Sequence, residues 1–235
     1  MTIWHLHNLN ARHALTPVLP EIRAAARQAV ALAGALADIP DFDLVVRARP
    51  DGGAPEWGID SGCAAPGVIE MAISPARFDD AAMVRALVRH MYQLIRQDGA
   101  AARGRGLGEA LVGEGLAAHF TQQALGGRPD PWDAAVPSSG LARRAMHEWS
   151  RLGWDRDEWF LGRGKMRKWS GYGLGQRLVA EHLAQNPGED AVTLARLPAD
   201  AFRAAIRALA KADGDAPEDD DAATPDTDAE GARNG

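Results

Sequence analysis

The chain has 235 residues, a formal net charge of −6 at neutral pH and a single cysteine, Cys63. These features exclude an internal disulfide framework, and the lack of a long apolar run or a basic block argues against a signal peptide, a membrane anchor and a nucleic-acid partner. We therefore expect a soluble cytoplasmic protein that binds neither membranes nor nucleic acids.

Strand patterns come first in the chain. Residues 2–7 alternate in polarity and predict a short strand. Apolar residues at helical spacing predict a helix over 16–38. Two segments rich in branched residues, 41–49 and 67–74, are predicted to be strands. The Gly-rich segment between the last two is expected to be a loop or a loose hairpin. Helical patterns follow and predict helices near 79–97, 107–125, 139–152, 170–185 and 198–211.

This segregation predicts an α+β fold, with a small N-terminal sheet packed on a mainly helical body. Residues 213–235 contain nine acidic residues and one arginine, and no large apolar side chain. Such a segment cannot offset the entropy of ordering. We therefore predict one folded domain, 1–211, followed by an acidic disordered tail, 212–235.

Two of the predicted helices each place one polar residue on an apolar face. His90 lies among Met83, Leu87 and Leu94 at helical spacing, and Glu114 lies in the apolar stripe of the next helix. A buried carboxylate or imidazole is costly without a partner. The pattern therefore indicates that His90 and Glu114 meet.

Several separated motifs resemble a bacterial family of predicted zinc-dependent proteases. They are "HMYQLIRQ" from His90, "EGLA" at 114–117, Pro131-Trp132 and "WSGYGLGQ" at 169–176. Members of that family carry His-Glu-x-x-His on one helix and Glu-Gly-Leu-Ala on the next. The resemblance implies a zincin-like fold with zinc held by two histidines and a glutamate, and with a glutamate as general base.

Carried over residue by residue, the resemblance makes His90 and Glu114 remnant metal ligands. Leu94 then occupies the second histidine position and Met91 the general-base position, so no catalytic set is intact and no cofactor is expected. Tyr172 is a candidate for stabilising an oxyanion. Neither Met91 nor Leu94 can donate a lone pair or accept a proton in the required way.

The leading interpretation is a degenerate, inactive member of the family. In it, His90 and Glu114 form a buried hydrogen-bonded pair, and the cleft retains binding of a peptide or protein segment along strand 67–74. One alternative is an active zinc metallopeptidase that recruits Glu109 or His119 as a non-standard ligand. A second alternative is a structural or oligomerising protein.

Overall fold

The computed structural model describes residues 2–49, 58–98 and 105–215. Its single sheet has the order β1-β2-β4-β3 and is formed by β1 (Trp4–Leu9), β2 (Phe42–Ala48), β3 (Ile59–Ala65) and β4 (Val68–Ile73). The first three strands in this order are parallel, and β3 is antiparallel to β4. The sheet therefore combines a strand-helix-strand crossover with a hairpin at one edge.

Six helices follow the predicted pattern: α1 (Leu19–Gly34), α2 (Asp80–Gln97), α3 (Leu107–Leu125), α4 (Leu141–Glu148), α5 (Ser170–Gln185) and α6 (Arg203–Asp215). Short turns η1 (Thr16–Val18), η2 (Pro75–Arg77), η4 (Asp157–Leu161) and η5 (Ala199–Phe202) join them. The α+β prediction is confirmed. None of the described helices combines the length and the apolarity needed to cross a bilayer.

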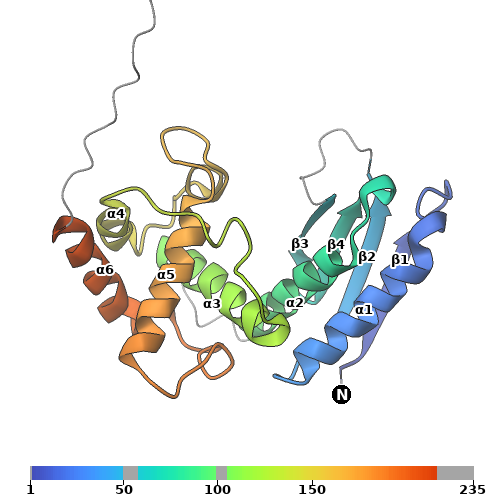
Figure 1. Ribbon diagram of the computed structural model, residues 1–235, viewed down its shortest axis with the longest axis horizontal. Helices are drawn as coiled ribbons and strands as arrows, with labels where there is room; N and C mark the ends of the chain where they lie inside the picture. The colour runs from blue at the N-terminus through green and yellow to red at the C-terminus, as the bar shows by residue number, and fades with distance from the viewer. Residues whose placement is uncertain (1, 50–57, 99–104, 216–235) are drawn as a thin grey trace, which may run out of the picture.

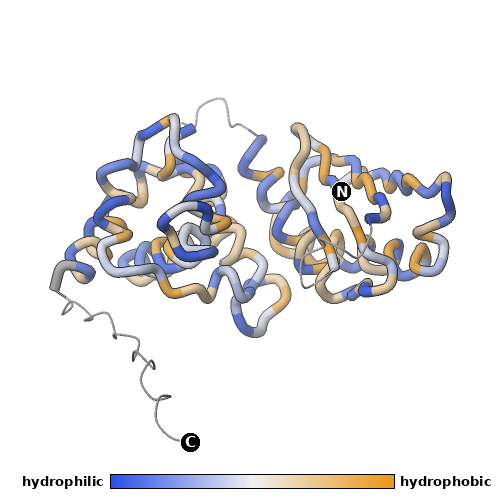
Figure 2. Tube along the Cα trace, turned by 90° about the horizontal axis from the view of Figure 1, so that it is seen from above, coloured by the Kyte–Doolittle hydropathy of each residue, from blue (hydrophilic) through white to orange (hydrophobic). Residues whose placement is uncertain are grey.

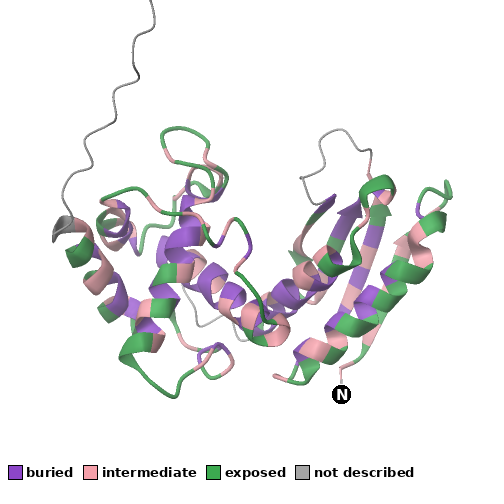
Figure 3. Cartoon of the chain, viewed as in Figure 1, coloured by how far each residue is buried: buried purple, intermediate pink, exposed green. Residues whose placement is uncertain are grey.

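The elements form two lobes that face each other (Figure 1). The sheet, α1 and α2 make one lobe, and α3 to α6 make the other; the two also lie side by side in the perpendicular view of Figure 2. Buried residues concentrate along α2, α3 and the adjoining part of α5 (Figure 3). A single apolar cluster runs through both lobes, so the cores are continuous where α2 meets α3.

The helix α6 ends at Asp215, so residues 212–215, which we predicted to belong to the tail, are helical. The helix begins at Arg203, later than the predicted start at residue 198, because the turn η5 occupies Ala199–Phe202. Regular apolar spacing in "RAAIRALAKA" explains why a helix forms here. The rest of the predicted tail, 216–235, lies outside the described residues.

The edge strand β3 lies in the segment where the sequence predicted a loop or a loose hairpin. Of its residues, "IDSGCAA", only Ile59 is β-branched, so the segment lacks the run of branched side chains by which strands are recognised. The strand forms because it pairs with β4 in an antiparallel hairpin. Our prediction that strand 67–74 borders the cleft was therefore wrong: β4 lies inside the sheet, and β3 is its edge.

Glycines allow α3 and α5 to approach closely, and this approach positions the site. A Cβ atom on Gly115 would lie 2.1 Å from the carbonyl oxygen of Gly175, and one on Gly175 would lie 2.5 Å from that of Leu111. A larger residue at either position would push the helices apart. The contact brings Glu114 of α3 and Tyr172 of α5 to one cavity, where both contact the guanidinium of Arg156.

Candidate functional site

A cavity of about 1130 Å³ lies between the two lobes. One wall comes from β3 and α2, and the other from α3, residues 130–132 and residues 156–172. His90, Glu114 and Tyr172 all line it, so the structure brings three of the sequence-predicted site residues to one place.

Helix α2 presents two adjacent stripes of side chains, and only one of them faces the cavity. Arg89 and Gln93 line the cavity and lie four residues apart, so they project from the same side of the helix. Met91 and Leu94 lie in the apolar core with 0% and 2% of their surface exposed. His90 lines the cavity at the boundary between the two stripes.

Both carboxylate oxygens of Glu114 bond to cationic or amide groups. The Arg89 guanidinium donates to Oε2 at 3.0 Å, the Arg156 guanidinium donates to Oε1 at 2.9 Å, and the Gln93 amide is 3.4 Å from Oε2. Arg89 also binds Asp133 through two contacts, at 2.7 and 3.2 Å. The centre of the site is thus a network of two carboxylates and two guanidiniums.

The predicted direct bond between His90 and Glu114 was wrong. His90 Nδ1 bonds to Gln93 Oε1 at 2.9 Å, and Nε2 bonds to the hydroxyl of Ser61 at 2.8 Å. Within the described part of the chain, Gln93 connects His90 with Glu114, because its amide bonds to both. The physical reason is the stronger attraction of Glu114 for permanently charged guanidinium groups than for a neutral imidazole.

The charges of this network are set by competition between burial and ion pairing. Burial alone would raise the pKa of Glu114, but the guanidiniums of Arg89 and Arg156 outweigh it and hold that pKa below its ordinary value. Burial lowers the pKa of His90, which favours the neutral imidazole. Burial raises the pKa of Asp133 to about 6, although Arg89 opposes the shift. Glu114 is therefore the fixed negative charge of the site.

Tyr172 is the third residue of α5 and lines the cavity, with its hydroxyl 3.4 Å from the Arg156 guanidinium. Burial, and then the negative charge of Glu114, raises its pKa to about 12. A protonated phenol beside a guanidinium is a hydrogen-bond donor directed at the cavity. Its predicted role toward an oxyanion stays a prediction.

The two residues named as alternative metal ligands have other partners. Glu109 accepts a hydrogen bond from Arg96 at 3.0 Å and another from the backbone N–H of Ala199 at 2.7 Å. His119 bonds to the backbone carbonyl of Gln176 at 3.1 Å and is not among the residues that line the cavity. Both side chains therefore tie α3 to neighbouring segments.

The residues around Glu114 do not fit a zinc ion. Zinc takes three or four nitrogen, sulfur or carboxylate ligands from the protein, whereas Arg89 and Arg156 offer no lone pair and add positive charge. In the described part of the chain, no group of three or more His, Cys, Asp or Glu side chains could hold a metal ion. The positions around the carboxylate are filled by cations of the protein itself.

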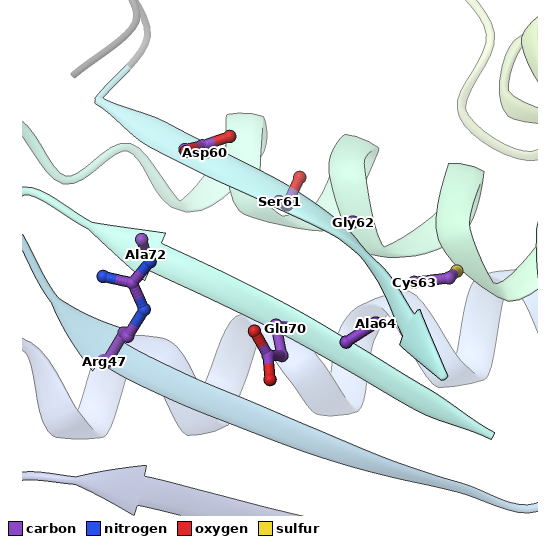
Figure 4. Close-up of a pocket in the computed structure, with 8 residues that line it drawn as sticks. All are labelled: Arg47, Asp60, Ser61, Gly62, Cys63, Ala64, Glu70 and Ala72. Carbon is purple, nitrogen blue, oxygen red and sulfur yellow. The ribbon is translucent and has the colours of Figure 1, made fainter. Parts of the chain in front are cut away.

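Strand β3 presents different groups on its two sides (Figure 4). On the outer face of the sheet, it borders a shallow pocket of about 260 Å³ with Arg47 and Glu70. Ser61 and Cys63 point to the other side, toward α2, where their side chains contact His90 and Gln93. The edge of β3 that is not paired with β4 therefore lines the cavity between the lobes.

The backbone of β3 also faces that cavity at alternate residues. Ser74 donates its N–H to the carbonyl of Gly58 at 2.9 Å, which makes this pair a hydrogen-bonded rung between β4 and β3. In an antiparallel ladder such rungs recur at every second residue. The N–H and C=O groups of Ser61 and Cys63 therefore point away from β4, toward the open edge.

Sequence analysis missed Arg89, Gln93, Arg156, Asp133 and Ser61. The signal for the first two was the spacing of four residues between them, which a search for His-x-x-x-His letters does not detect. Asp133 directly follows the Pro-Trp motif, and Arg156 and Ser61 stand in segments without periodicity. Only their positions in space connect these last residues with Glu114.

Comparison with known proteins agrees with the resemblance seen in the motifs. No curated protein and no solved structure matches the chain. A family model described as "Predicted Zn-dependent protease (DUF2268)" matches residues 26–204, about three quarters of the sequence, from within α1 to the start of α6. The chain therefore belongs to this family of predicted zinc-dependent proteases.

Proposed function

We propose that this chain has lost zinc-dependent hydrolysis and uses the cleft between its lobes to bind an extended peptide segment. The observation that carries the first part is the pairing of both Glu114 oxygens with guanidinium groups, from Arg89 and Arg156. Guanidinium is protonated at every physiological pH. A carboxylate neutralised in this way has little attraction left for a metal cation.

The geometry supports a ligand pair one residue earlier than the sequence motif suggested. Arg89 and Gln93 both contact Glu114 and stand one helical turn apart. The family pattern His-Glu-x-x-His, placed on residues 89–93, therefore puts Arg89 and Gln93 at the ligand positions and His90 at the base position. Arginine cannot ligate and amides are poor zinc ligands, so the loss extends to both ligands on this helix.

Peptide binding is supported by the open edge of β3. An extended segment can add to such an edge by main-chain hydrogen bonds, with pockets for alternate side chains. Trp132, Trp169 and Tyr172 form aromatic surface on the opposite wall. Arg156 has 53% of its side chain exposed, and with Lys168 it favours an acidic side chain in the bound segment.

Metal analysis tests the first part of the proposal. Protein purified without chelators should contain far less than one zinc per chain, and calorimetric titration should detect no stoichiometric zinc binding. One zinc per chain that disappears in Glu114→Gln would overturn this part.

Binding to an array of extended peptides, followed by fluorescence anisotropy, tests the second part. Acidic peptides should bind, and Arg156→Gln should weaken them about tenfold, equivalent to about 1.4 kcal/mol. Arg163→Gln is the matched control, because Arg163 is exposed and does not line the cavity. A chain that binds no peptide, or one that Arg163→Gln weakens equally, contradicts peptide binding at this cleft.

A further inference from the structure

A chain of hydrogen bonds runs across the cavity from Glu114 to the edge strand. Gln93 Nε2 is 3.4 Å from Glu114 Oε2, Gln93 Oε1 is 2.9 Å from His90 Nδ1, and His90 Nε2 is 2.8 Å from Ser61 Oγ. The three links join α3, α2 and β3. Peptide binding along β3 makes no use of the hydroxyl at the end of this chain.

The ionised carboxylate determines which atom donates in each link. Glu114 can only accept, so the Gln93 amide must direct its NH₂ group at the carboxylate and its oxygen at His90. The oxygen also accepts only, and His90 Nδ1 therefore carries the imidazole proton. The lone pair is left on Nε2, where the Ser61 hydroxyl donates. Cys63 is consistent with this orientation, since its thiol lies 3.6 Å from the same amide oxygen.

We propose that Ser61, His90 and Gln93 form a metal-independent acyl-transfer centre, in which Ser61 is the nucleophile, His90 is its base and Gln93 positions the base. The nucleophile and the base are within hydrogen-bond distance, and a third group orients the base, which is the arrangement that activates a serine hydroxyl. The substrate class is carboxylic esters. The backbone N–H group of Ser61 faces the same open edge and supplies a donor for the developing oxyanion.

The reaction balances without a metal or a redox partner. Ser61 Oγ forms a bond to the carbonyl carbon while its proton passes to His90 Nε2. The bond between that carbon and the alcohol oxygen breaks, and the alcohol leaves with the proton from His90. Water then attacks the acyl-serine, gives a proton to Nε2 and releases the acid, and the proton returns to Ser61. The net change is ester plus water to acid plus alcohol.

The cavity favours esters with an aromatic or an anionic group. Trp132 and Trp169 stand edge to face, with ring centroids 6.5 Å apart, and both line the cavity. Lys168 lies over the ring of Trp169 at 4.2 Å and brings positive charge to the same wall. Aryl esters are therefore suitable probes.

A serine-directed fluorophosphonate tests the centre on the full chain. In buffer containing a chelator, mass spectrometry of the digested protein should find the phosphonyl group on Ser61 at close to one per chain. Ser150 is the matched control, because it is exposed and is not among the residues that line the cavity. Folded protein that is not labelled at Ser61, or that is labelled equally at Ser150, overturns the proposal.

Variants separate catalysis from structure. Ser61→Ala should abolish the label, and His90→Gln should slow labelling at least about a hundredfold, the usual contribution of a general base. Gln93→Met removes the acceptor for Nδ1 at similar size and should slow labelling by about tenfold or more in protein that circular dichroism shows to be folded. Labelling of Gln93→Met at the wild-type rate would refute the positioning role. Wild-type protein should also release a burst of p-nitrophenol from p-nitrophenyl acetate, which Ser61→Ala should not.

The inference uses the cleft of the proposed function but does not depend on peptide binding. Peptide binding is measured on the wild-type chain without the reagent, and labelling is measured without peptide. Peptide binding without labelling would remove only the acyl-transfer centre. Labelling without peptide binding would remove only the peptide-binding proposal.

Discussion

The position of the ligand pair along α2 can be tested by rebuilding it in two registers. One variant combines Arg89→His, His90→Glu and Gln93→His, and restores the family pattern on the stripe that faces Glu114. The other combines Met91→Glu with Leu94→His, and restores it in the register that the sequence motif suggested. The two variants introduce the same kinds of side chain into one helix.

The second variant should unfold the protein or make it insoluble. Met91 and Leu94 are buried in the apolar core, and loss of each large apolar side chain costs about 2–5 kcal/mol before the cost of burying polar groups is added. The sum is comparable with the whole stability of an ordinary domain, about 5–15 kcal/mol. The substituted groups would also point away from Glu114.

The first variant should fold and bind zinc. Without metal we expect a loss of about 3–5 kcal/mol, because Glu114 and Asp133 lose the guanidinium of Arg89 from a buried network. Zinc at about a hundred times its Kd would restore about 2.7 kcal/mol. Asp133 remains beside position 89, where it can orient the introduced imidazole.

Thermal unfolding with and without zinc, together with metal analysis after dialysis, distinguishes the two registers. We expect one zinc per chain and a zinc-dependent rise in Tm for the variant at positions 89, 90 and 93. A metal-free result for that variant, combined with one zinc bound by the variant at positions 91 and 94, would refute the register deduced from the cavity.

Three further predictions concern the packing and charge of the site. Arg89→Met should lower the free energy of unfolding, measured in urea, by about 3–5 kcal/mol. Arg144→Met, which removes partly exposed ion pairs, should lower it by less than about 1 kcal/mol. Equal effects would contradict a stabilising role of the buried ion pairs of Arg89. Gly115→Ala should destabilise the fold by about 1–3 kcal/mol, because its Cβ would meet the carbonyl of Gly175. Gly113→Ala should be neutral or should stabilise the fold by up to about 1 kcal/mol, because its Cβ would lie 3.7 Å from Arg96 Nε. Burial, and then the charge of Glu114, raises the pKa of the Cys63 thiol to about 12. The folded protein should therefore react with iodoacetamide slowly at pH 8 and faster as the pH approaches 12, and unfolding should accelerate the reaction at pH 8 more than about a hundredfold. Rapid reaction of the folded protein at pH 8 would refute the raised pKa.

Local sequence patterns were sufficient to predict most of the secondary structure. Apolar residues at helical spacing placed α2, α3 and α5 within one residue of their observed ends, because such a stripe can be buried in only one conformation. The strand β3 was not predicted, because its small residues form a strand only when β4 lies beside them. Edge pairing is a long-range contact, and no local pattern encodes it.

The amino-acid sequence by itself determined the α+β class, the burial of His90 and Glu114, and the family to which the motifs belong. Only the tertiary structure decided which side chains meet. One residue along a helix changes the direction of a side chain by about 100°, so the choice between the stripe of Arg89 and Gln93 and that of Met91 and Leu94 depends on how α2 is rotated against α3. That rotation follows from packing across the whole core, and it gave Glu114 two guanidiniums and His90 the hydroxyl of Ser61.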